Sequence, residues 1–470
     1  MILRHLYQRS LAHASYLVGG GASGEALIVD PNRDVDQYIA LAEREGLRIA
    51  AIVETHIHAD FVSGAPELAA RTGARLYLSG AGGADWQYAN AAATLLHDGD
   101  SFCLDNIRFD VWHVPGHTPE HIALLVTDTA VADAPMGMIS GDFVFVGDVG
   151  RPDLLEKAVG VANTSDGAAR QLFHSLQRFK TLPDWLQVWP AHGAGSPCGK
   201  ALGAVPQSTV GYERRFNPAL VIDDEDAFVR FILADQPAPP LAFRQINHRN
   251  QYGASPEPNA GSIQQLAAAD LRGVLADKTV LVDTRSAAEF AHGHVRGAIN
   301  LPITQSMLTW AGWTLPYDRP LALIAADQCA AVEVAHTLRL IGLDNVIGFW
   351  NPAALDHTDQ PLATINRVDV AAFAALRDAG TTVLDVRRHD EYRNGHVAGS
   401  LHIPLQELHK RWHEIPLDRP LALHCQSGMR SALVASLLTG RTKQPIYDLV
   451  GGYSAWNAAG REVEQSESGE

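Results

Sequence analysis

Short apolar runs alternate with amphipathic stretches through the first 245 residues of the chain. The apolar runs are rich in aliphatic and aromatic side chains and predict strands, whereas the stretches between them predict helices. The clearest predicted strands are residues 15–19, 25–30, 49–53, 75–78 and 107–112, and the clearest predicted helices are 35–46, 66–72 and 225–234. This alternation predicts an α/β domain over residues 1–245.

Side chains that can bind a metal follow four separate apolar runs. Because strand ends gather along one rim of an α/β scaffold, we expect these side chains to meet. Imidazole and carboxylate groups together are ligands of first-row metals. The four segments are Glu54–Gly64 with His56, His58 and Asp60, Val114–His121 with His117 and His121, Met138–Asp153 with Asp142, and Leu186–Gly193 with His192.

The motifs in these segments have a family resemblance. Thr-His-Ile-His-Ala-Asp, Pro-Gly-His-Thr, Ser-Gly-Asp and Pro-Ala-His, in this order and spacing, resemble the metallo-β-lactamase superfamily. That resemblance implies an αββα sandwich with a metal at one rim. Within the superfamily, residues 145–154 (Phe-Val-Gly-Asp-Val-Gly-Arg-Pro-Asp-Leu) and 192–200 are most similar to the persulfide dioxygenases, also called sulfur dioxygenases.

The similarity to persulfide dioxygenases implies a metal site with one Fe(II) per chain. Its implied ligands are His56, His117 and Asp142, and two imidazoles with one carboxylate leave positions open for substrate and O2. The remaining polar residues of the motifs, which are His58, Asp60, His121 and His192, are then expected to orient ligands or substrate. Each of these four could instead be a hydrogen-bonded structural residue.

One position departs from the superfamily pattern. The motif usually continues with a second His after the Asp, and this His helps to hold a second metal, but here the residue is Phe61. A two-zinc hydrolase would lose part of its second site, whereas a mononuclear centre loses nothing essential. Asp148 is an alternative ligand. We prefer Asp142 because the Ser-Gly-Asp motif matches at that position.

Three basic residues after the motifs could bind substrate. Lys200, Arg214 and Arg215 could pair with the carboxylates of a tripeptide thiol, although an ordinary solvated surface explains them equally well. Residues 250–262, rich in Pro, Asn, Gly and Ser, predict a linker.

Composition narrows the class of protein. The chain has 470 residues, a net charge of -16 and 46% hydrophobic residues, which suggests about three soluble domains of ~150 residues each. The negative charge argues against nucleic acid or an anionic membrane as the main partner, and no apolar run approaches the ~18 residues of a membrane span. The four cysteines have no paired spacing, so we expect free thiols, a cytoplasmic location and, for the assembly, a homo-oligomer.

An internal repeat fills the second half of the chain. Residues 280–302 recur as residues 383–404, and Asp318–Leu323 recurs as Asp418–Leu423. Each copy alternates strand and helix over about 100 residues and predicts a small α/β domain with an open parallel sheet. The predicted domains are 262–355 and 364–463.

The two copies differ at one position. In the second copy, Cys425 leaves a buried strand and is followed by a Gly-bearing loop, by Arg430 and by a helix predicted over residues 431–438. Backbone N–H groups of such a loop and the positive end of the helix stabilise a thiolate. Cys-x-x-Gly-x-Arg, with Asp-Val-Arg and Gly-His-Val-x-Gly upstream, resembles the rhodanese domain. The resemblance implies that Cys425 and Arg430 are the catalytic residues and that Cys425 carries sulfane sulfur as a persulfide.

In the first copy, Ala325 occupies the position of Cys425. Cys329 lies four positions later, and no Arg follows it in register. We therefore predict a degenerate rhodanese-like domain over 262–355, with a structural or binding role.

The combined resemblances imply a persulfide dioxygenase fused to a rhodanese sulfurtransferase. The dioxygenase would oxidise glutathione persulfide, or a similar small persulfide, with O2 to sulfite and thiol. The sulfurtransferase would move sulfane sulfur between persulfide or thiosulfate and sulfite or thiol. Two alternatives stay open: a metal-dependent thioester hydrolase of the glyoxalase II kind, and a C-terminal half that is mainly an interaction or sulfur-carrier arm.

Overall fold

The computed structural model describes every residue except 22, 90–91, 161, 201, 254–262, 268–270, 272–277, 358–360 and 466–470. The chain divides into two compact units, of which the first comprises residues 1–256 and 339–342 and the second the remaining residues. The first unit contains the four metal-ligand segments, and the second contains both copies of the repeat.

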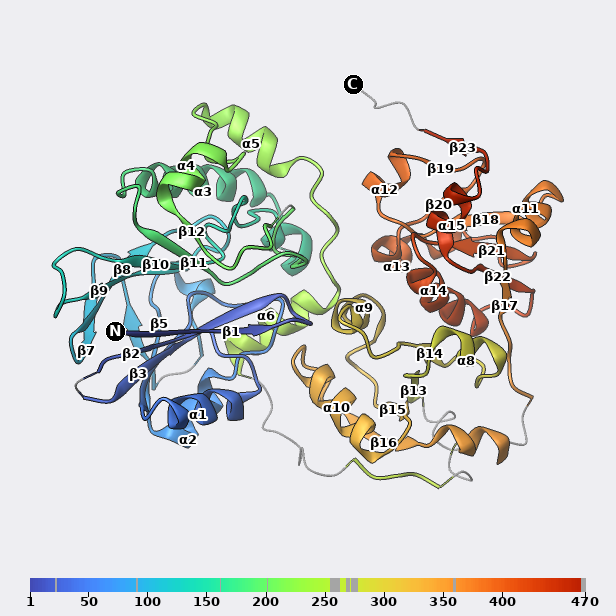
Figure 1. Ribbon diagram of the computed structural model, residues 1–470, viewed down its shortest axis with the longest axis horizontal. Helices are drawn as coiled ribbons and strands as arrows, with labels where there is room; N and C mark the ends of the chain where they lie inside the picture. The colour runs from blue at the N-terminus through green and yellow to red at the C-terminus, as the bar shows by residue number, and fades with distance from the viewer. Residues whose placement is uncertain are drawn as a thin grey trace. The chain divides into compact units, whose positions relative to one another are not determined.

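Two mixed sheets of six strands each form the centre of the first unit (Figure 1). In spatial order, the first sheet is β1 (Ile2–Gln8), β2 (His13–Gly19), β3 (Glu25–Val29), β4 (Arg48–Val53), β5 (Arg75–Ser79) and β6 (Thr94–Leu96). The second is β12 (Ser208–Thr209), β11 (Gln187–Pro190), β10 (Gly137–Gly141), β9 (Ile122–Asp128), β8 (Ile107–His113) and β7 (Ser101–Leu104).

Three apolar layers hold these sheets and their helices together. Inward side chains of both sheets, among them Val18, Leu27, Phe109 and Leu124, form the middle layer. Helices α1 (Val35–Arg44) and α2 (Ala65–Thr72) cover the outer face of the first sheet. Helices α3 (Ser165–Phe179) and α5 (Glu225–Leu233) cover the outer face of the second. The predicted αββα sandwich is therefore confirmed.

The strands that precede the four ligand segments end close to where the sequence predicts. β4 ends at Val53, β8 at His113, β10 at Gly141 and β11 at Pro190, each shortly before a ligand-type residue. Because these strands belong to two sheets that pack face to face, their carboxyl ends meet at one rim of the sandwich.

The linker prediction begins too early. Helix α6 runs from Ala242 to Tyr252 and so occupies the first residues of the predicted linker 250–262. Its inward residues make contacts in the first unit, as described below, which explains why it continues past residue 245. The rest of the predicted linker, residues 254–262, lies outside the described residues.

The second unit contains a four-stranded and a five-stranded sheet in which every described strand pair is parallel, and a small antiparallel sheet of β19 (His396–Val397) and β23 (Val463–Glu464). The first copy has the strand order β14 (Ile299–Asn300), β13 (Val280–Asp283), β15 (Leu321–Ile324) and β16 (Val346–Trp350). The second has β17 (Asn366–Val368), β22 (Ile446–Leu449), β21 (Leu421–His424), β18 (Thr382–Asp385) and β20 (Leu401–His402). Both parallel sheets agree with the predicted small parallel α/β domains.

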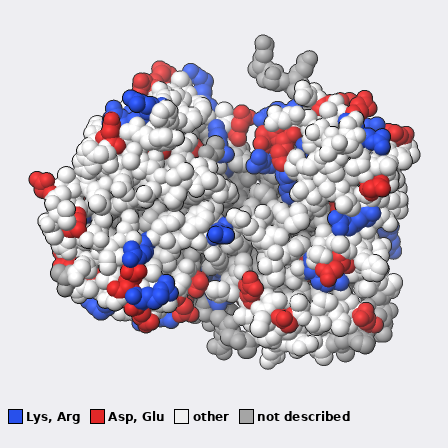
Figure 2. All heavy atoms as spheres, viewed as in Figure 1, with Lys and Arg blue, Asp and Glu red and all other residues white. Residues whose placement is uncertain are grey.

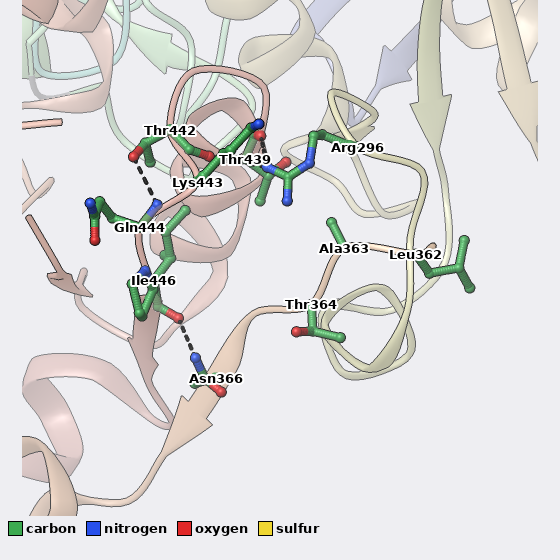
Figure 3. A pocket seen from close by; sticks show the side chains of 11 residues that line it. Arg296, Leu362, Ala363, Thr364, Asn366, Thr439, Thr442, Lys443, Gln444 and Ile446 are labelled. Carbon is green, nitrogen blue, oxygen red and sulfur yellow. Dashed lines mark hydrogen bonds between the residues drawn. The ribbon is translucent and has the colours of Figure 1, made fainter. Parts of the chain in front are cut away.

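Helix α14 (Met429–Thr439) joins the two copies within this unit. Its buried residues lie on all sides, because its own sheet covers one face and the first copy covers another. The Asn300 N–H, at the edge of β14, donates to Ser436 Oγ at 2.9 Å, and Arg296 donates to the Thr439 carbonyl at 2.8 Å. A polar cavity of about 280 Å³ remains at this junction, with Arg296 and Lys443 in its lining (Figure 3).

Charge is mixed on the surface. On the face drawn in Figure 2, acidic and basic side chains are interspersed rather than segregated. Among the described residues, no helix is both long and apolar enough to cross a membrane.

A buried Asp–Arg pair stiffens each copy at the same place. Arg285 pairs with Asp283 at 2.6 Å, and Arg387 pairs with Asp385 at 2.7 Å. Arg387 is 1% exposed and also donates to the Gly395 carbonyl at 2.8 Å. Burial raises the pKa of Asp385, but His424 and Arg387 together bring it below its ordinary value. The guanidinium therefore holds a charged carboxylate inside the domain.

Arg387→Leu is expected to destabilise the second copy by about 3–5 kcal/mol, because it leaves the Asp385 charge buried and unpaired. Thermal unfolding of the full chain, followed by circular dichroism, checks the result. The control is Arg388→Leu, since that side chain is 56% exposed in its pair with Asp390. Equal melting of the two variants would contradict the role given to the buried pair.

Candidate metal centre and sulfur-transfer loop

The loop that follows β4 is held by side chains from three other elements. Asp30 accepts the Thr55 N–H at 2.7 Å, and Glu120 accepts the Ile57 N–H at 2.7 Å. Asn250 of α6 donates to the carbonyls of His58 and Phe61, each at 2.8 Å. The loop backbone is thus fixed without regular secondary structure, as a precise ligand site requires.

Three imidazoles surround the Asp142 carboxylate. His117 Nε2 lies 3.4 Å and His56 Nε2 3.9 Å from Asp142 Oδ2, and His192 Nε2 lies 3.3 Å from Oδ1. All four residues are buried. Neither Asp142 oxygen accepts a well-formed hydrogen bond from a described residue. A buried carboxylate without such partners is costly unless a cation or ligand satisfies it.

The second nitrogen of each of these rings is already engaged. His117 Nδ1 lies 3.2 Å from the Arg151 carbonyl, and His192 Nδ1 lies 3.0 Å from the Ala12 carbonyl. His56 Nδ1 lies 3.0 Å from Thr55 Oγ1, whose own proton goes to Asp30. Each Nδ1 is therefore the donor, and each Nε2 presents a lone pair toward Asp142. This arrangement is typical of histidines that bind a metal.

The backbone at Asp142 is fixed by His121. The Asp142 N–H donates to His121 Nε2 at 2.9 Å, so that nitrogen is not free to bind a metal. Gly141 precedes it with a φ of 55°, and a Cβ there would lie 2.7 Å from Thr55 Oγ1. Asp142 therefore turns into the site through a glycine that no larger residue could replace without strain.

The donor set fits a single first-row cation. His56, His117 and Asp142 each offer one ligand atom, and these atoms lie within 4.8 Å of one another. Two neutral imidazoles and one carboxylate suit Fe(II) or Zn(II). The structure thus brings together the three residues that the resemblance implies as ligands.

His58 points to a different group of carboxylates. Its Nε2 lies 3.1 Å from Asp30 Oδ1 and 3.2 Å from Glu54 Oε2. Burial lowers the pKa of His58, but these two carboxylates raise it to well above its ordinary value. The Phe61 ring packs on His58 with their centroids 4.3 Å apart. His58 therefore contacts Asp30 and Glu54 behind the loop rather than Asp142.

Sequence reasoning missed one member of the site. Asp60, His192 and Cys198 form a second group of donors within 4.8 Å of one another, and all three are buried. Burial and the nearby Asp60 and Asp142 carboxylates hold the pKa of the Cys198 thiol well above its ordinary value. The signal was the spacing of Cys198 from the strand-end His192, but the scattered cysteines gave no reason to single it out.

Arg151 contacts both His117 and the segment just before Cys198. It pairs with Asp153 at 2.8 Å, its side chain donates to the Pro197 carbonyl at 3.0 Å, and its own carbonyl accepts from His117. The Gly-Arg-Pro-Asp motif thus orients a candidate ligand histidine and positions the residue before Cys198.

The other predicted residues of this unit make different contacts. Lys200 Nζ donates to the Phe231 carbonyl at 2.9 Å, Arg214 pairs with Asp184 at 2.7 Å, and Arg215 is exposed. These contacts are not with the ligand cluster. Asp148 accepts the Lys200 N–H at 2.7 Å, and its carbonyl accepts from Phe145 across a tight turn, which agrees with its predicted place in a turn.

Cys425 lies directly after β21, at the start of the loop that enters α14. Its Sγ accepts the Gly428 N–H at 3.1 Å, and its carbonyl accepts the Tyr453 N–H at 2.7 Å. Gly452 has a φ of 59°, and a Cβ there would lie 2.4 Å from the Cys425 carbonyl oxygen. Arg430, in the first turn of α14, donates twice to Glu391, with both distances 2.7 Å.

The corresponding loop of the first copy has a different chemistry. Ala325 follows β15, and Asp327 accepts the Ala330 N–H at 2.9 Å at the start of α10 (Gln328–Arg339). A carboxylate therefore occupies the helix end where the second copy has its thiol. Cys329 is exposed on that helix. At the position of Cys425 this copy therefore has Ala325, which has no thiol, and the helix after it is capped by Asp327.

Comparisons with known proteins agree with this architecture. Residues 10–192 match the metallo-beta-lactamase superfamily model, and residues 267–353 and 369–459 each match the rhodanese-like domain model. A crystal structure of a metallo-beta-lactamase from Staphylococcus aureus subsp. aureus COL is 39% identical and covers 75% of this chain and 99% of its own, with a TM-score of 0.68. A hydroxyacylglutathione hydrolase of Chromohalobacter salexigens is 32% identical over 232 residues, which are 44% of this chain and 82% of the relative.

This chain belongs to the metallo-β-lactamase superfamily and carries two rhodanese-like domains. Another relative is the mitochondrial persulfide dioxygenase ETHE1 of Homo sapiens, which is 28% identical over 235 residues, or 49% of this chain and 80% of the relative. The first unit is thus similar to both hydrolases and dioxygenases of the superfamily.

Gly150→Ala tests the backbone around Asp142. The added Cβ would lie 1.9 Å from the Asp142 carbonyl oxygen and 2.9 Å from His117 Cβ, so two of the three candidate ligands must move. We expect Fe(II) affinity, measured by competition with a chelator, to fall at least about 10-fold. Gly167→Ala is the control, because a Cβ there meets nothing within 4 Å. Unchanged affinity in Gly150→Ala would show that these residues do not hold the ion.

Proposed function

We propose that the first unit is a mononuclear iron persulfide dioxygenase and that the second rhodanese-like domain is a sulfurtransferase acting on related sulfur compounds. The observation that carries the proposal is the buried set of His56, His117 and Asp142 beside Phe61, which supports one cation with open positions. The similarity to persulfide dioxygenase ETHE1 supports the substrate class.

The proposed oxidation converts a persulfide, O2 and water into a thiol, sulfite and two protons. Fe(II) bound by His56, His117 and Asp142 would supply the site where the persulfide sulfur and O2 meet and the redox chemistry that joins them. Glutathione persulfide is the proposed substrate, and a related small persulfide would serve the same chemistry.

The surrounding residues keep this site ordered and dry. Asp30, through Thr55, and the Arg151 carbonyl hold the His56 and His117 rings in the tautomer that exposes Nε2. His121 holds the backbone of Asp142. The fully buried Phe61 and Phe145 rings exclude water from the neighbouring volume.

Asp60 and His192 are the proposed contacts for the reacting sulfur compound. Asp60 Oδ2 lies 3.2 Å from His192 Nε2, and the same nitrogen lies 3.3 Å from Asp142. Since neither Asp60 Oδ2 nor His192 Nε2 has a well-formed hydrogen bond to a described residue, both are available to a substrate thiol or a water.

The proposed sulfur transfer runs through Cys425. Its thiolate attacks the outer sulfur of a thiol persulfide, the S–S bond of the donor breaks, and the donor thiol leaves with the proton. Sulfite then attacks the terminal sulfur of the Cys425 persulfide, which forms thiosulfate and returns the thiolate. The Gly428 N–H, 3.1 Å from Sγ, stabilises the negative charge of the Cys425 thiolate that attacks the donor and is released again by sulfite. Fusion of the two activities raises the local concentration of shared intermediates.

A thioester hydrolase is the second candidate function. The group of Asp60, His192 and Cys198 could hold a second cation although Phe61 replaces the usual histidine. The 32% identity with a hydroxyacylglutathione hydrolase also favours the hydrolase function. A bimetallic site with hydrolysis of a glutathione thioester would identify this activity.

O2 uptake with glutathione persulfide tests the dioxygenase. We expect the iron-loaded wild type to consume O2 and form sulfite, and His117→Ala to lose at least about 100-fold in rate, because it removes a metal ligand. Hydrolysis of a glutathione thioester without persulfide-dependent O2 uptake would contradict the proposal and support the hydrolase.

Cys425→Ser is the matched variant in the other unit. We expect it to retain O2 uptake and to lose sulfur transfer to sulfite, because an alcohol cannot carry sulfane sulfur. An equal loss of O2 uptake in this variant would contradict the separation of the two activities. Unchanged sulfur transfer would leave the rhodanese-like domains with a binding role.

A further inference from the structure

The cation of the sulfur-transfer loop is already paired with an acid. Both terminal nitrogens of Arg430 donate to Glu391, with each distance 2.7 Å. The two side chains are 17% and 19% exposed, so solvent screens the pair only partly. Burial lowers the pKa of Arg430 and raises that of Glu391, but their contact reverses both shifts, so both groups are charged.

This pair lies beside the thiol. Arg430 is in the first turn of the helix that follows the loop, close enough to Cys425 for the thiolate to raise the pKa of the guanidinium. The other cation beneath the loop, Arg387, pairs with Asp385 at 2.7 Å. Both of these arginines are therefore matched by a carboxylate.

The candidate substrates differ in their charge at the reacting sulfur. Thiosulfate and sulfite carry up to two negative charges close to the atom that reacts, whereas a thiol persulfide carries at most one there. Glu391 should therefore disfavour the two oxyanions in two ways, since it repels them and since it withholds Arg430 from them. Backbone N–H groups, such as that of Gly428, remain available to either kind of substrate.

We propose that Glu391 determines the substrate specificity of this sulfurtransferase by weakening the binding of inorganic sulfur oxyanions relative to thiol persulfides. The inference rests on the sulfurtransferase activity proposed above and adds the residue that sets its relative affinity for these substrates. Glu391 acts through Arg430 and through its own charge, so it is a specificity residue rather than a catalytic residue.

The first copy supplies an internal comparison. Glu289 occupies the position of Glu391 in the repeat and accepts the Ser286 N–H at 3.1 Å, as Glu391 accepts the Arg388 N–H at 2.9 Å. Both glutamates thus cap a short helix, but the first copy has no loop arginine in register with Arg430. Capping alone therefore does not require the ion pair.

The test is Glu391→Gln in the full chain, with Glu289→Gln as the control. Glutamine can still accept the capping N–H, so the fold is retained while one charge is removed. We expect Glu391→Gln to lower KM for thiosulfate and for sulfite about fivefold, with kcat changed less, because a like charge near the bound dianion is gone. KM for glutathione persulfide should change less than about twofold, and the thiosulfate effect should shrink in high salt.

Equal changes in KM for thiosulfate and for glutathione persulfide, or the same KM for thiosulfate in Glu391→Gln and the wild type, would overturn the inference while leaving the sulfurtransferase intact. An effect of the same size in Glu289→Gln would also overturn it, because Glu289 caps a helix of the first copy and belongs to a different domain from the Cys425 loop. A wild-type chain that transfers no sulfur from any donor would overturn both the inference and the proposed activity.

Discussion

The buried Asp142 carboxylate is the constraint on which the first unit depends. It is fully buried, its oxygens lack well-formed hydrogen bonds to the described residues, and three imidazole nitrogens face it at 3.3–3.9 Å. Such a group is unfavourable in a protein interior unless a cation lies among these atoms. Four separate strand ends and their loops are arranged to supply that environment.

The support for this carboxylate extends well beyond its immediate neighbours. Backbone groups of Arg151 and Ala12 fix two of the rings, and the amide of Asn250 fixes the loop that carries the third. Helix α6 therefore contributes to the site although none of its residues is a candidate ligand. Precision at a metal site comes from such contacts, because a ligand is only as well placed as the backbone behind it.

Much of this architecture was predictable from residue patterns, and the failures have physical reasons. Periodicity identified the strands before His56, His117, Asp142 and His192, because β4, β10 and β11 are mostly buried and apolar and β8 alternates buried apolar residues with half-buried ones. Cys198 could not be assigned, since its place in the site depends on how an irregular loop folds back. The linker was predicted too early because tertiary contacts of Asn247 and Asn250 extend α6 into a stretch with polar composition.

The repeat shows how little sequence change separates a catalytic loop from a structural one. Both copies keep the Asp–Arg pair and the parallel sheet, but one has Cys425 and Arg430 where the other has Ala325 and Ala330, and Asp327 caps the helix that follows in the latter. The sequence identified this divergence because it lies in aligned positions. The pairing of Arg430 with Glu391 was not predictable, since it joins helices that are 39 positions apart.

The number of metal ions per chain tests the central claim most directly. After anaerobic purification, elemental analysis should find about one iron per chain and no second ion, because Phe61 stands in the sequence where the superfamily motif has its second-metal histidine. Two metal ions per chain, held also by Asp60, His192 and Cys198, would contradict the mononuclear account.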